Sequence, residues 1–305
     1  MPRDRPSVYR YEASVKSSVS DEAINTYLIR PMAGAVVRLL YATKVTPNQV
    51  TLLSTAAGLV AAPLFIPGSH ALTAAAGLLV TLKDILDSAD GQLARARQQY
   101  SRSGRFLDSI GDFLVNAALF AAIGIRIAGT TGVPTAAMLA LAGFLGTTLR
   151  VSYHVFYQTA FLLAQGGQGV NRLSEEVRPE DAQAPAGTRR LQRLFLILYG
   201  WQDRAIAALD HRSGRRSLAT GDLVRCWYTN VTALRFAATI GLGTDLFLLM
   251  LCALANAPDI YLGINLVLLN GVWCGAVAYR RWWVFPELRQ GATMRDDSGG
   301  SGANT

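Results

Sequence analysis

Charged side chains are scarce in this chain. Asp, Glu, Lys and Arg make up 16% of its 305 residues, against 51% hydrophobic residues, whereas a soluble domain is about one-quarter charged. Cysteine is also scarce: Cys226, Cys252 and Cys274 lack metal-ligand spacing and are interpreted as packing residues. We expect no signal peptide, because the first residues are charged and lack an apolar core. The scarcity of charge argues against an ordinary soluble domain.

The apolar residues occur in long runs instead. A helix needs roughly 20 apolar residues to cross the core of a bilayer. Such runs cover residues 48–67, 71–90, 105–128, 133–160, 233–256 and 258–284. We therefore predict an all-α fold, a polytopic membrane helix bundle with six transmembrane helices.

Basic residues alternate along the chain. Residues 1–47 hold seven Lys or Arg, residues 91–105 four, residues 166–232 ten and residues 280–305 four, whereas the three intervening connections hold only Arg126. This alternation follows the positive-inside rule and predicts that both termini are cytoplasmic. We interpret the net charge of +8 as membrane topology and attraction to anionic lipid, and not as nucleic-acid binding.

The segments outside the spans are assigned from their patterns. Residues 1–20 are predicted to be flexible, residues 44–165 to carry the first four spans, residues 233–284 the last two, and residues 285–305 to form a disordered tail. Residues 166–232 are predicted to be a cytoplasmic loop with an amphipathic helix at 191–211. The alternative for 191–211, a seventh span, would place one terminus outside.

Residues 21–43 are predicted to form an interfacial amphipathic helix. Their apolar residues recur every three or four positions, which builds one helix face. That face comprises Ile24, Tyr27, Leu28, Met32, Ala35, Val36, Leu39 and Leu40. The alternative is a helix packed on a soluble partner. The Thr46-Pro47 pair that follows is typical of an N-cap and first helical position.

Aspartates are concentrated in DILDSADGQLARARQQYSRSGRFLDSIGD, residues 84–112. Asp87 and Asp90 are three residues apart, and Asp108 and Asp112 are four apart, so each pair shares a helix face. A basic loop joins the two helices in an antiparallel hairpin, which brings the four carboxylates to one cytoplasmic end. Their repulsion is relieved by a divalent cation, Mg²⁺, Mn²⁺ or Ca²⁺. The alternative is a set of helix caps and ion pairs with the loop arginines.

Two glycines and an arginine accompany these aspartates. Gly91 follows Asp90 directly, and Gly104 lies one turn before Asp108, so a ligand can approach the backbone closely. Arg95 lies one turn beyond Gly91 and has the planar fork that holds a phosphate in bidentate fashion. A metal, carboxylates, an arginine and two glycines together indicate a diphosphate ligand.

The complete pattern is Asp87-x2-Asp90-Gly91-x2-Ala94-Arg95-x8-Gly104-x3-Asp108-x3-Asp112. It resembles the signature of the CDP-alcohol phosphotransferase family, and all eight fixed positions match. The start of the first span, residues 46–51, resembles that family too. The resemblance covers residues 20–165, whereas the last two spans match only as generic membrane helices.

The resemblance implies the reaction and its residues. A phosphoryl-alcohol group, such as the phosphatidyl group of CDP-diacylglycerol, passes to the hydroxyl of an acceptor alcohol, and CMP is released in phospholipid biosynthesis. Asp87, Asp90, Asp108 and Asp112 would hold one or two Mg²⁺ or Mn²⁺ ions, with Asp112 also the general base. The nucleotide would contact Asn48, Thr51, Gly91, Arg95, Ser101 and Gly104. The family also implies a homodimer in the bilayer, with its active site at the cytoplasmic face.

Basic residues inside the spans are candidates for the acceptor. Arg150 and Arg235 are predicted to lie near Asp112 and to bind an anionic acceptor such as an inositol phosphate or glycerol phosphate. An internal ion pair or snorkelling to the surface is the alternative for both. Asp84 and Asp245 have no assigned role; a salt bridge with Lys83 or Arg105 is the alternative for Asp84.

Two other functions are compatible with parts of the pattern. An intramembrane prenyltransferase also binds Mg²⁺ and a diphosphate through aspartates, although the spacing of Gly91, Arg95 and Gly104 favours the CDP family. A cation-coupled transporter would need broken helices near the midplane of the membrane. The aspartates instead lie at one end of the predicted hairpin.

Overall fold

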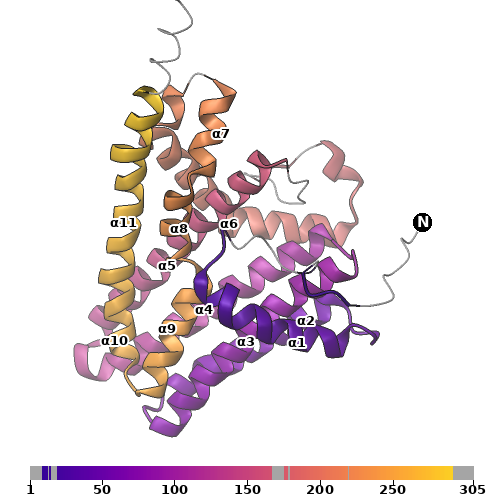
Figure 1. Ribbon diagram of the computed structural model, residues 1–305. Coiled ribbons are helices and arrows are strands. Elements are labelled where there is room, and N and C mark those ends of the chain that lie inside the picture. Colours follow the sequence, from indigo (N-terminus) through magenta and orange to yellow (C-terminus); the bar gives the residue numbers. More distant parts are fainter. Residues whose placement is uncertain are drawn as a thin grey trace, which may run out of the picture.

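The computed structural model describes residues 9–12, 14, 19–166, 175–177, 179–218 and 220–290. These residues form helices and connecting loops without β-strands, which confirms the predicted all-α class (Figure 1). The α-helices are α1 (Arg30–Leu40), α2 (Pro47–Ala61), α3 (His70–Ala96), α4 (Arg102–Thr131), α5 (Val133–Ala164), α6 (Ala186–Ser213), α7 (Gly221–Thr229), α8 (Val231–Ala238), α9 (Leu242–Leu254), α10 (Pro258–Gly263) and α11 (Asn270–Tyr279).

Short segments of other helix types extend several of these helices. Residues Asn25–Ile29 form a π-helical segment before α1, and Ala62–Phe65 form a 3₁₀ turn after α2. The π-helical segments Ile264–Leu269 and Arg280–Val284 flank α11. Two further 3₁₀ turns, Pro179–Gln183 and Arg215–Ser217, lie on either side of α6.

Five helical stretches of the described chain are long and apolar enough to cross a membrane. They are Pro47–Phe65, Arg102–Thr131, Val133–Ala164, Val231–Leu254 and Pro258–Gln290. The remaining predicted span, 71–90, lies within the 27-residue helix α3, which carries Lys83 and three aspartates. Every predicted span is therefore helical, and the chain is a multi-pass membrane protein.

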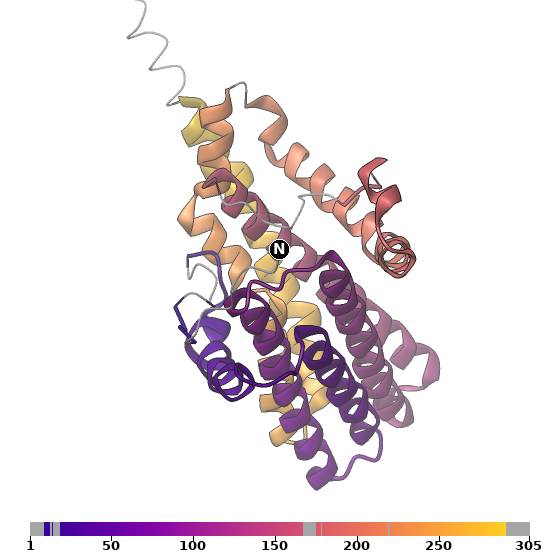
Figure 2. The same cartoon turned by 90° about the vertical axis from the view of Figure 1, so that its right-hand side faces the viewer.

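A core of apolar side chains joins the front half of the chain to α9. Phe65, Val80, Leu119, Ile123 and Leu249 belong to one buried cluster, so α2, α3, α4 and α9 pack around a common centre. The cavity described below lies beside this core, between helices α3 and α4 and helices α5 and α6. Figure 2 shows α1, in indigo, and α6, in salmon, on opposite sides of the bundle.

The N-terminal helix has two apolar faces. Ile29, Ala33 and Val37 are buried against Leu86 and Leu93 of α3. The predicted apolar face remains largely outside the protein, with Tyr27 82% and Leu39 79% exposed. The residues of this helix that pack on the bundle are therefore not the ones that the sequence spacing predicted for its apolar face. That this exposed face lies at the membrane interface stays a prediction.

The fifth predicted span is divided into α8 and α9. Glu22 causes this division, because its carboxylate accepts hydrogen bonds from the backbone amides of Gly243 (3.2 Å) and Thr244 (2.6 Å) at the start of α9. A carboxylate there accepts hydrogen bonds from amides that have no partner within the helix. Its negative charge also interacts favourably with the positive end of the helix dipole. The residue is more than 200 positions away in the sequence, so hydropathy could not predict the break.

The region between the fourth and fifth spans is more helical than expected. Helix α6 begins at Ala186, five residues before the predicted start, and the short helix α7 was not predicted. Asp210 ties the two together by accepting hydrogen bonds from Trp227 Nε1 (2.8 Å) and from the hydroxyl of Tyr228 (2.9 Å). The alternative for residues 191–211, a seventh span, is not among the membrane-length helices of the described residues.

The two chain ends are described only in part. The tail was predicted to begin at residue 285, but the last helix continues to Gln290 because Phe285 and Leu288 pack on the buried cluster around Trp227. Residues 291–305 of the predicted tail lie outside the described residues. So do residues 1–8, 13 and 15–18 of the predicted flexible N-terminus and residues 167–174 of the predicted loop.

Asp245 has partners that the sequence did not reveal. Its carboxylate accepts hydrogen bonds from Thr147 Oγ1 (2.9 Å), the hydroxyl of Tyr261 (3.1 Å) and Asn265 Nδ2 (3.0 Å). It also pairs with the guanidinium of Arg150 at 3.4 Å. Both ionic side chains are buried, so this network links α5, α9 and the last span inside the bundle.

We predict that Arg150→Met lowers the melting temperature of the detergent-solubilised protein. Losing one partner of a buried ion pair costs about 3–5 kcal/mol, since the other charge stays buried and uncompensated. The double variant Arg150→Met/Asp245→Leu should regain most of that stability. Arg235→Met, at an exposed arginine of α8, is the matched control. An unchanged melting temperature for Arg150→Met would show that the pair does not stabilise the bundle.

Candidate functional site

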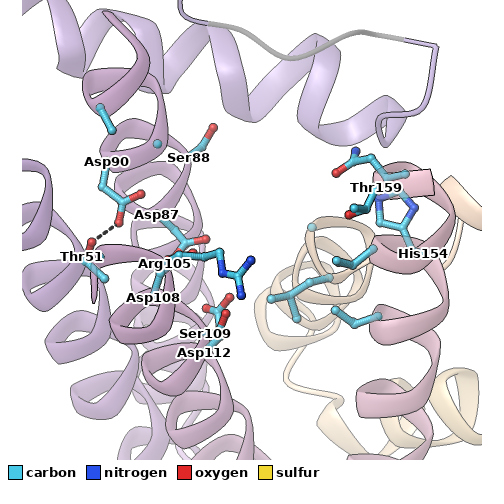
Figure 3. Close-up of a pocket in the computed structure, with 18 of the residues that line it drawn as sticks. Thr51, Asp87, Ser88, Asp90, Arg105, Asp108, Ser109, Asp112, His154 and Thr159 are labelled. Atoms are coloured by element: carbon cyan, nitrogen blue, oxygen red, sulfur yellow. Dashed lines mark hydrogen bonds between the residues drawn. The ribbon is translucent and has the colours of Figure 1, made fainter. Parts of the chain in front are cut away.

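A cavity of about 680 Å³ opens between two walls of the bundle. One wall carries the aspartates of α3 and α4, and the facing wall is formed by α5 and α6. Figure 3 shows Asp87, Asp90, Asp108 and Asp112 on the first wall, with His154 and Thr159 of α5 across the gap. Glu22, from the segment before α1, and Arg30, the first residue of α1, also line the cavity.

The helix hairpin predicted for residues 84–112 is present in the structure and brings the aspartates together. Helix α3 ends at Ala96 and α4 begins at Arg102, so the two aspartate pairs lie near the same end of the hairpin. Ser101 starts α4 as its N-cap, because its Oγ accepts a hydrogen bond from the amide of Gly104 at 3.0 Å. This cap holds the loop between the two pairs in place.

Three of the aspartates form a compact cluster. One carboxylate oxygen from each of Asp87, Asp90 and Asp108 lies within 4.8 Å of the other two. Asp108 Oδ1 is buried and makes no hydrogen bond to any described residue. Thr51 Oγ1 donates a hydrogen bond to Asp90 Oδ2 and so orients that carboxylate (Figure 3). Oxygen ligands at this density, one of them without a partner, fit a hard divalent cation.

Asp112 lies against a buried lysine. Lys83 Nζ donates to Asp112 Oδ1 and lies 3.4 Å from Asp87 Oδ1. The lysine side chain is 2% exposed, so it supplies positive charge inside the carboxylate cluster. Sequence reasoning considered Lys83 as a partner of Asp84, but the i, i+4 spacing of Lys83 and Asp87 was the more informative signal.

The structure brings all six predicted nucleotide contacts to the cavity: Asn48, Thr51, Gly91, Arg95, Ser101 and Gly104. A Cβ at position 104 would lie 2.7 Å from Asn48 Oδ1 and 2.8 Å from Ser101 Oγ, so any other residue there would require these side chains to shift. A Cβ at Gly91 would lie 3.2 Å from Arg95 Nη1. The arginine is held by the N-terminal segment, because its Nε donates to the carbonyl oxygen of Ser14.

The two predicted acceptor contacts are not at the cavity. Arg150 is fully buried in the network with Asp245, and besides that carboxylate it donates to Asn270 Oδ1 at 2.6 Å. Arg235 is exposed on α8. Neither residue lines the cavity. The structure therefore favours the internal ion pair as the role of Arg150.

Several cavity residues were missed in the sequence. Arg105, Tyr199 and Asp203 line it, and Glu175 pairs with Arg105 at 2.5 Å. Arg30 lines it as well and pairs with Asp21 at 2.7 Å. Apart from Arg105, each comes from a segment outside the aspartate pattern. Arg105 belongs to α4, and its pairing is visible only once Glu175 is placed beside it.

Burial shifts the titration of groups around the cavity. Desolvation raises the pKa of Glu22 to about 7, although the amide and hydroxyl of Thr244 oppose this rise. Burial also raises the pKa of Asp203. The pKa of Tyr199 is raised by burial first and then by the charges of Asp112 and Asp108. These environments are partly desolvated and rich in negative charge.

Comparison with known proteins identifies the segment that holds this cavity wall. The sequence model of a family described as CDP-alcohol phosphatidyltransferase matches residues 44–166. The matched segment contains α2 to α5 and the whole pattern from Asp87 to Asp112. Helix α6, α9 and the N-terminal segment complete the cavity from outside that match.

Curated relatives match parts of the chain. The protein named bifunctional IPC transferase and DIPP synthase from Thermococcus kodakarensis is 34% identical over 133 residues, 44% of this chain and 29% of that protein. The phosphatidylinositol phosphate synthase of Mycobacteroides abscessus is 35% identical over 96 residues, 32% of this chain and 41% of that protein. Inner membrane protein YnjF of Escherichia coli is 37% identical over 89 residues, 29% of this chain and 41% of that protein.

The chain spans less than half the length of each of these relatives. The family match includes the aspartate hairpin, which forms one wall of the cavity. Residues 44–166 of this chain thus match the CDP-alcohol phosphatidyltransferase family.

Proposed function

We propose that the protein transfers a phosphoryl-alcohol group from a CDP-linked donor, such as CDP-diacylglycerol, to the hydroxyl of an acceptor alcohol and releases CMP. The observation that carries this proposal is the cluster of Asp87, Asp90 and Asp108 in a cavity that the six predicted nucleotide contacts also line. The family match over residues 44–166 supports it. The reaction belongs to phospholipid biosynthesis in the membrane.

The donor binds at the edge of the cavity formed by α2 and the hairpin. Gly91 and Gly104 leave room for the diphosphate next to the backbone. Arg95 provides a planar fork for its oxygens, and Asn48 and Thr51 line the same edge. Asp87, Asp90, Asp108 and Asp112 hold one or two Mg²⁺ or Mn²⁺ ions. When bound, the divalent cation supplies positive charge that stabilises the diphosphate and its transition state.

Asp112 acts as the general base. Its carboxylate lines the cavity, and Lys83 engages Oδ1, which leaves Oδ2 for the proton of the acceptor hydroxyl. The acceptor oxygen forms a bond to the phosphorus nearer the donor alcohol, and the bond from that phosphorus to the CMP oxygen breaks. Lys83 keeps the carboxylate oriented and balances its charge.

The membrane arrangement extends the proposal. Lysines and arginines are concentrated in segments 1–47, 91–105 and 166–232. Their distribution supports a cytoplasmic active site with both termini on the same side. The protein acts as a homodimer, as the family resemblance implies. Release of CMP, and not of inorganic diphosphate, separates this reaction from that of a prenyltransferase, and turnover in detergent without a gradient separates it from transport.

We predict that Asp112→Asn lowers CMP release from CDP-diacylglycerol by at least about 100-fold, because a positioned general base typically contributes about 10²–10⁴-fold. Binding of the CDP-lipid, measured with a radiolabelled donor, should remain detectable. The control is Asp259→Asn, an exposed aspartate of α10 outside the cavity. Wild-type turnover in Asp112→Asn would contradict the assignment of the base.

We also predict that Asp108→Asn weakens Mn²⁺ binding, followed by electron paramagnetic resonance of the free ion. Residues that only orient a metal ligand contribute about 10–100-fold to metal affinity. The loss of a direct ligand should therefore weaken Mn²⁺ binding by at least about tenfold. Asp259→Asn again serves as the control. Equal Mn²⁺ affinity in Asp108→Asn and in wild type would rule out Asp108 as a ligand.

A further inference from the structure

A lysine is buried in the predicted span of α3, one helical turn before the family signature begins. Lys83 is 2% exposed, and a buried ammonium group is costly in an apolar bundle unless it is paired. Its carbonyl oxygen accepts a hydrogen bond from Ser54 Oγ of α2 at 3.0 Å. A Cβ at Gly58 of α2 would lie 3.2 Å from Lys83 Cγ, so the stem of the lysine is packed on α2.

The ammonium group of this lysine joins two aspartates of the signature. Lys83 Nζ donates a hydrogen bond to Asp112 Oδ1 and lies 3.4 Å from Asp87 Oδ1. Asp87 belongs to α3 and Asp112 to α4, so the lysine connects the two helices of the hairpin at the site itself. The neighbouring Asp84 is close enough for its charge to interact with the same ammonium group. Lys83 is therefore a cation that the fold holds among carboxylates.

Asp87 takes part in two groupings of charge. With Asp90 and Asp108 it forms the compact cluster suited to a divalent cation, and Asp112 is not a member of that cluster among the described residues. Asp87 also contacts the lysine that engages Asp112. Two cation positions that lie next to each other resemble a two-metal site, in which the ions are about 3.5–4 Å apart. In this protein the ammonium group of Lys83 occupies the position between Asp87 and Asp112.

A metal ion between Asp87 and Asp112 would compete with Lys83. It would need the Asp112 oxygen that already accepts a hydrogen bond from the lysine. Its charge would also lie beside the ammonium group, where burial leaves the repulsion between two cations weakly screened. The lysine has no easy route to solvent, because its side chain is buried and its stem is packed on α2. The lysine and a second metal ion are therefore alternatives at this position.

We propose that Lys83 takes the place of a second metal ion, so that the site binds a single divalent cation through Asp87, Asp90 and Asp108. This inference rests on the proposed function and narrows it. It reduces the one or two ions to one, and it removes Asp112 from the metal ligands. Asp112 is then held by the lysine and keeps Oδ2 for the proton of the acceptor hydroxyl. The protein itself supplies the positive charge on the side of the base.

The number of bound ions tests this inference. Mn²⁺ is titrated into the full chain in detergent, and the free and bound ions are followed by electron paramagnetic resonance. We expect one Mn²⁺ per wild-type chain, with the hyperfine pattern of an isolated ion. Lys83→Met keeps most of the stem and removes the charge. We expect this variant to bind two Mn²⁺ per chain and to show the altered spectrum of two magnetically coupled ions, as in a two-metal site.

Two variants serve as controls for the ion count. Lys83→Met/Asp112→Asn removes the lysine together with a carboxylate of the second position, so it should bind one ion. Because neither partner of the buried pair is left alone, this double variant should also fold more stably than Lys83→Met. Lys44→Met makes the same change at an exposed lysine outside the cavity and should bind one ion, as wild type does.

The outcomes separate this inference from the proposed function. Two Mn²⁺ per wild-type chain, or a single Mn²⁺ in folded Lys83→Met, overturns the role of Lys83 and leaves CDP-alcohol transfer intact. If Lys83→Met does not fold, the count in wild type decides, because a second ion there is incompatible with the lysine. A wild-type chain that binds one ion but releases no CMP from CDP-diacylglycerol with any acceptor alcohol overturns the proposed function alone. Absence of Mn²⁺ binding overturns the metal site and the role of Lys83 together.

Discussion

The burial of carboxylates in an apolar bundle is the constraint on which the rest of this structure depends. Asp87, Asp90, Asp108 and Asp112 converge at one end of the α3–α4 hairpin, where burial reduces the screening of their repulsion by water. Lys83 supplies one positive charge from within the cluster. The compact arrangement of the other three carboxylates, with Asp108 Oδ1 lacking a partner, calls for further positive charge. A divalent cation satisfies this requirement and gives the site its chemistry.

Elsewhere in the protein the same constraint is met by internal partners. Asp245 is surrounded by Arg150 and neutral donors, Asp210 by the indole and hydroxyl donors of Trp227 and Tyr228, and Glu22 by backbone amides of α9. These pairings connect helices that are distant in the sequence. The pairing with Asp245 also occupies the guanidinium of Arg150, which is why this basic residue of the spans does not mark the acceptor site.

The boundary of the family match has a structural meaning. Residues 44–166 supply the aspartate wall and α5, whereas α6, α9 and the segment before α1 close the cavity around them. The aspartates of the proposed reaction thus belong to one segment, and the rest of the cavity lining comes in part from segments outside it. Glu22 and Asp203 belong to those outer segments.

The sequence by itself determined the helical membrane class, the positions of most spans and the aspartate pattern, because hydropathy and helical spacing are local properties of the chain. It also predicted the six residues that line the donor edge, through the resemblance carried by Asp87 to Asp112. Only the tertiary structure decided that Arg150 pairs with Asp245, that Glu22 divides the fifth span, and that Lys83 lies against Asp112. Each of these depends on contacts between segments that the fold brings together, and no local pattern records which buried charge meets which partner.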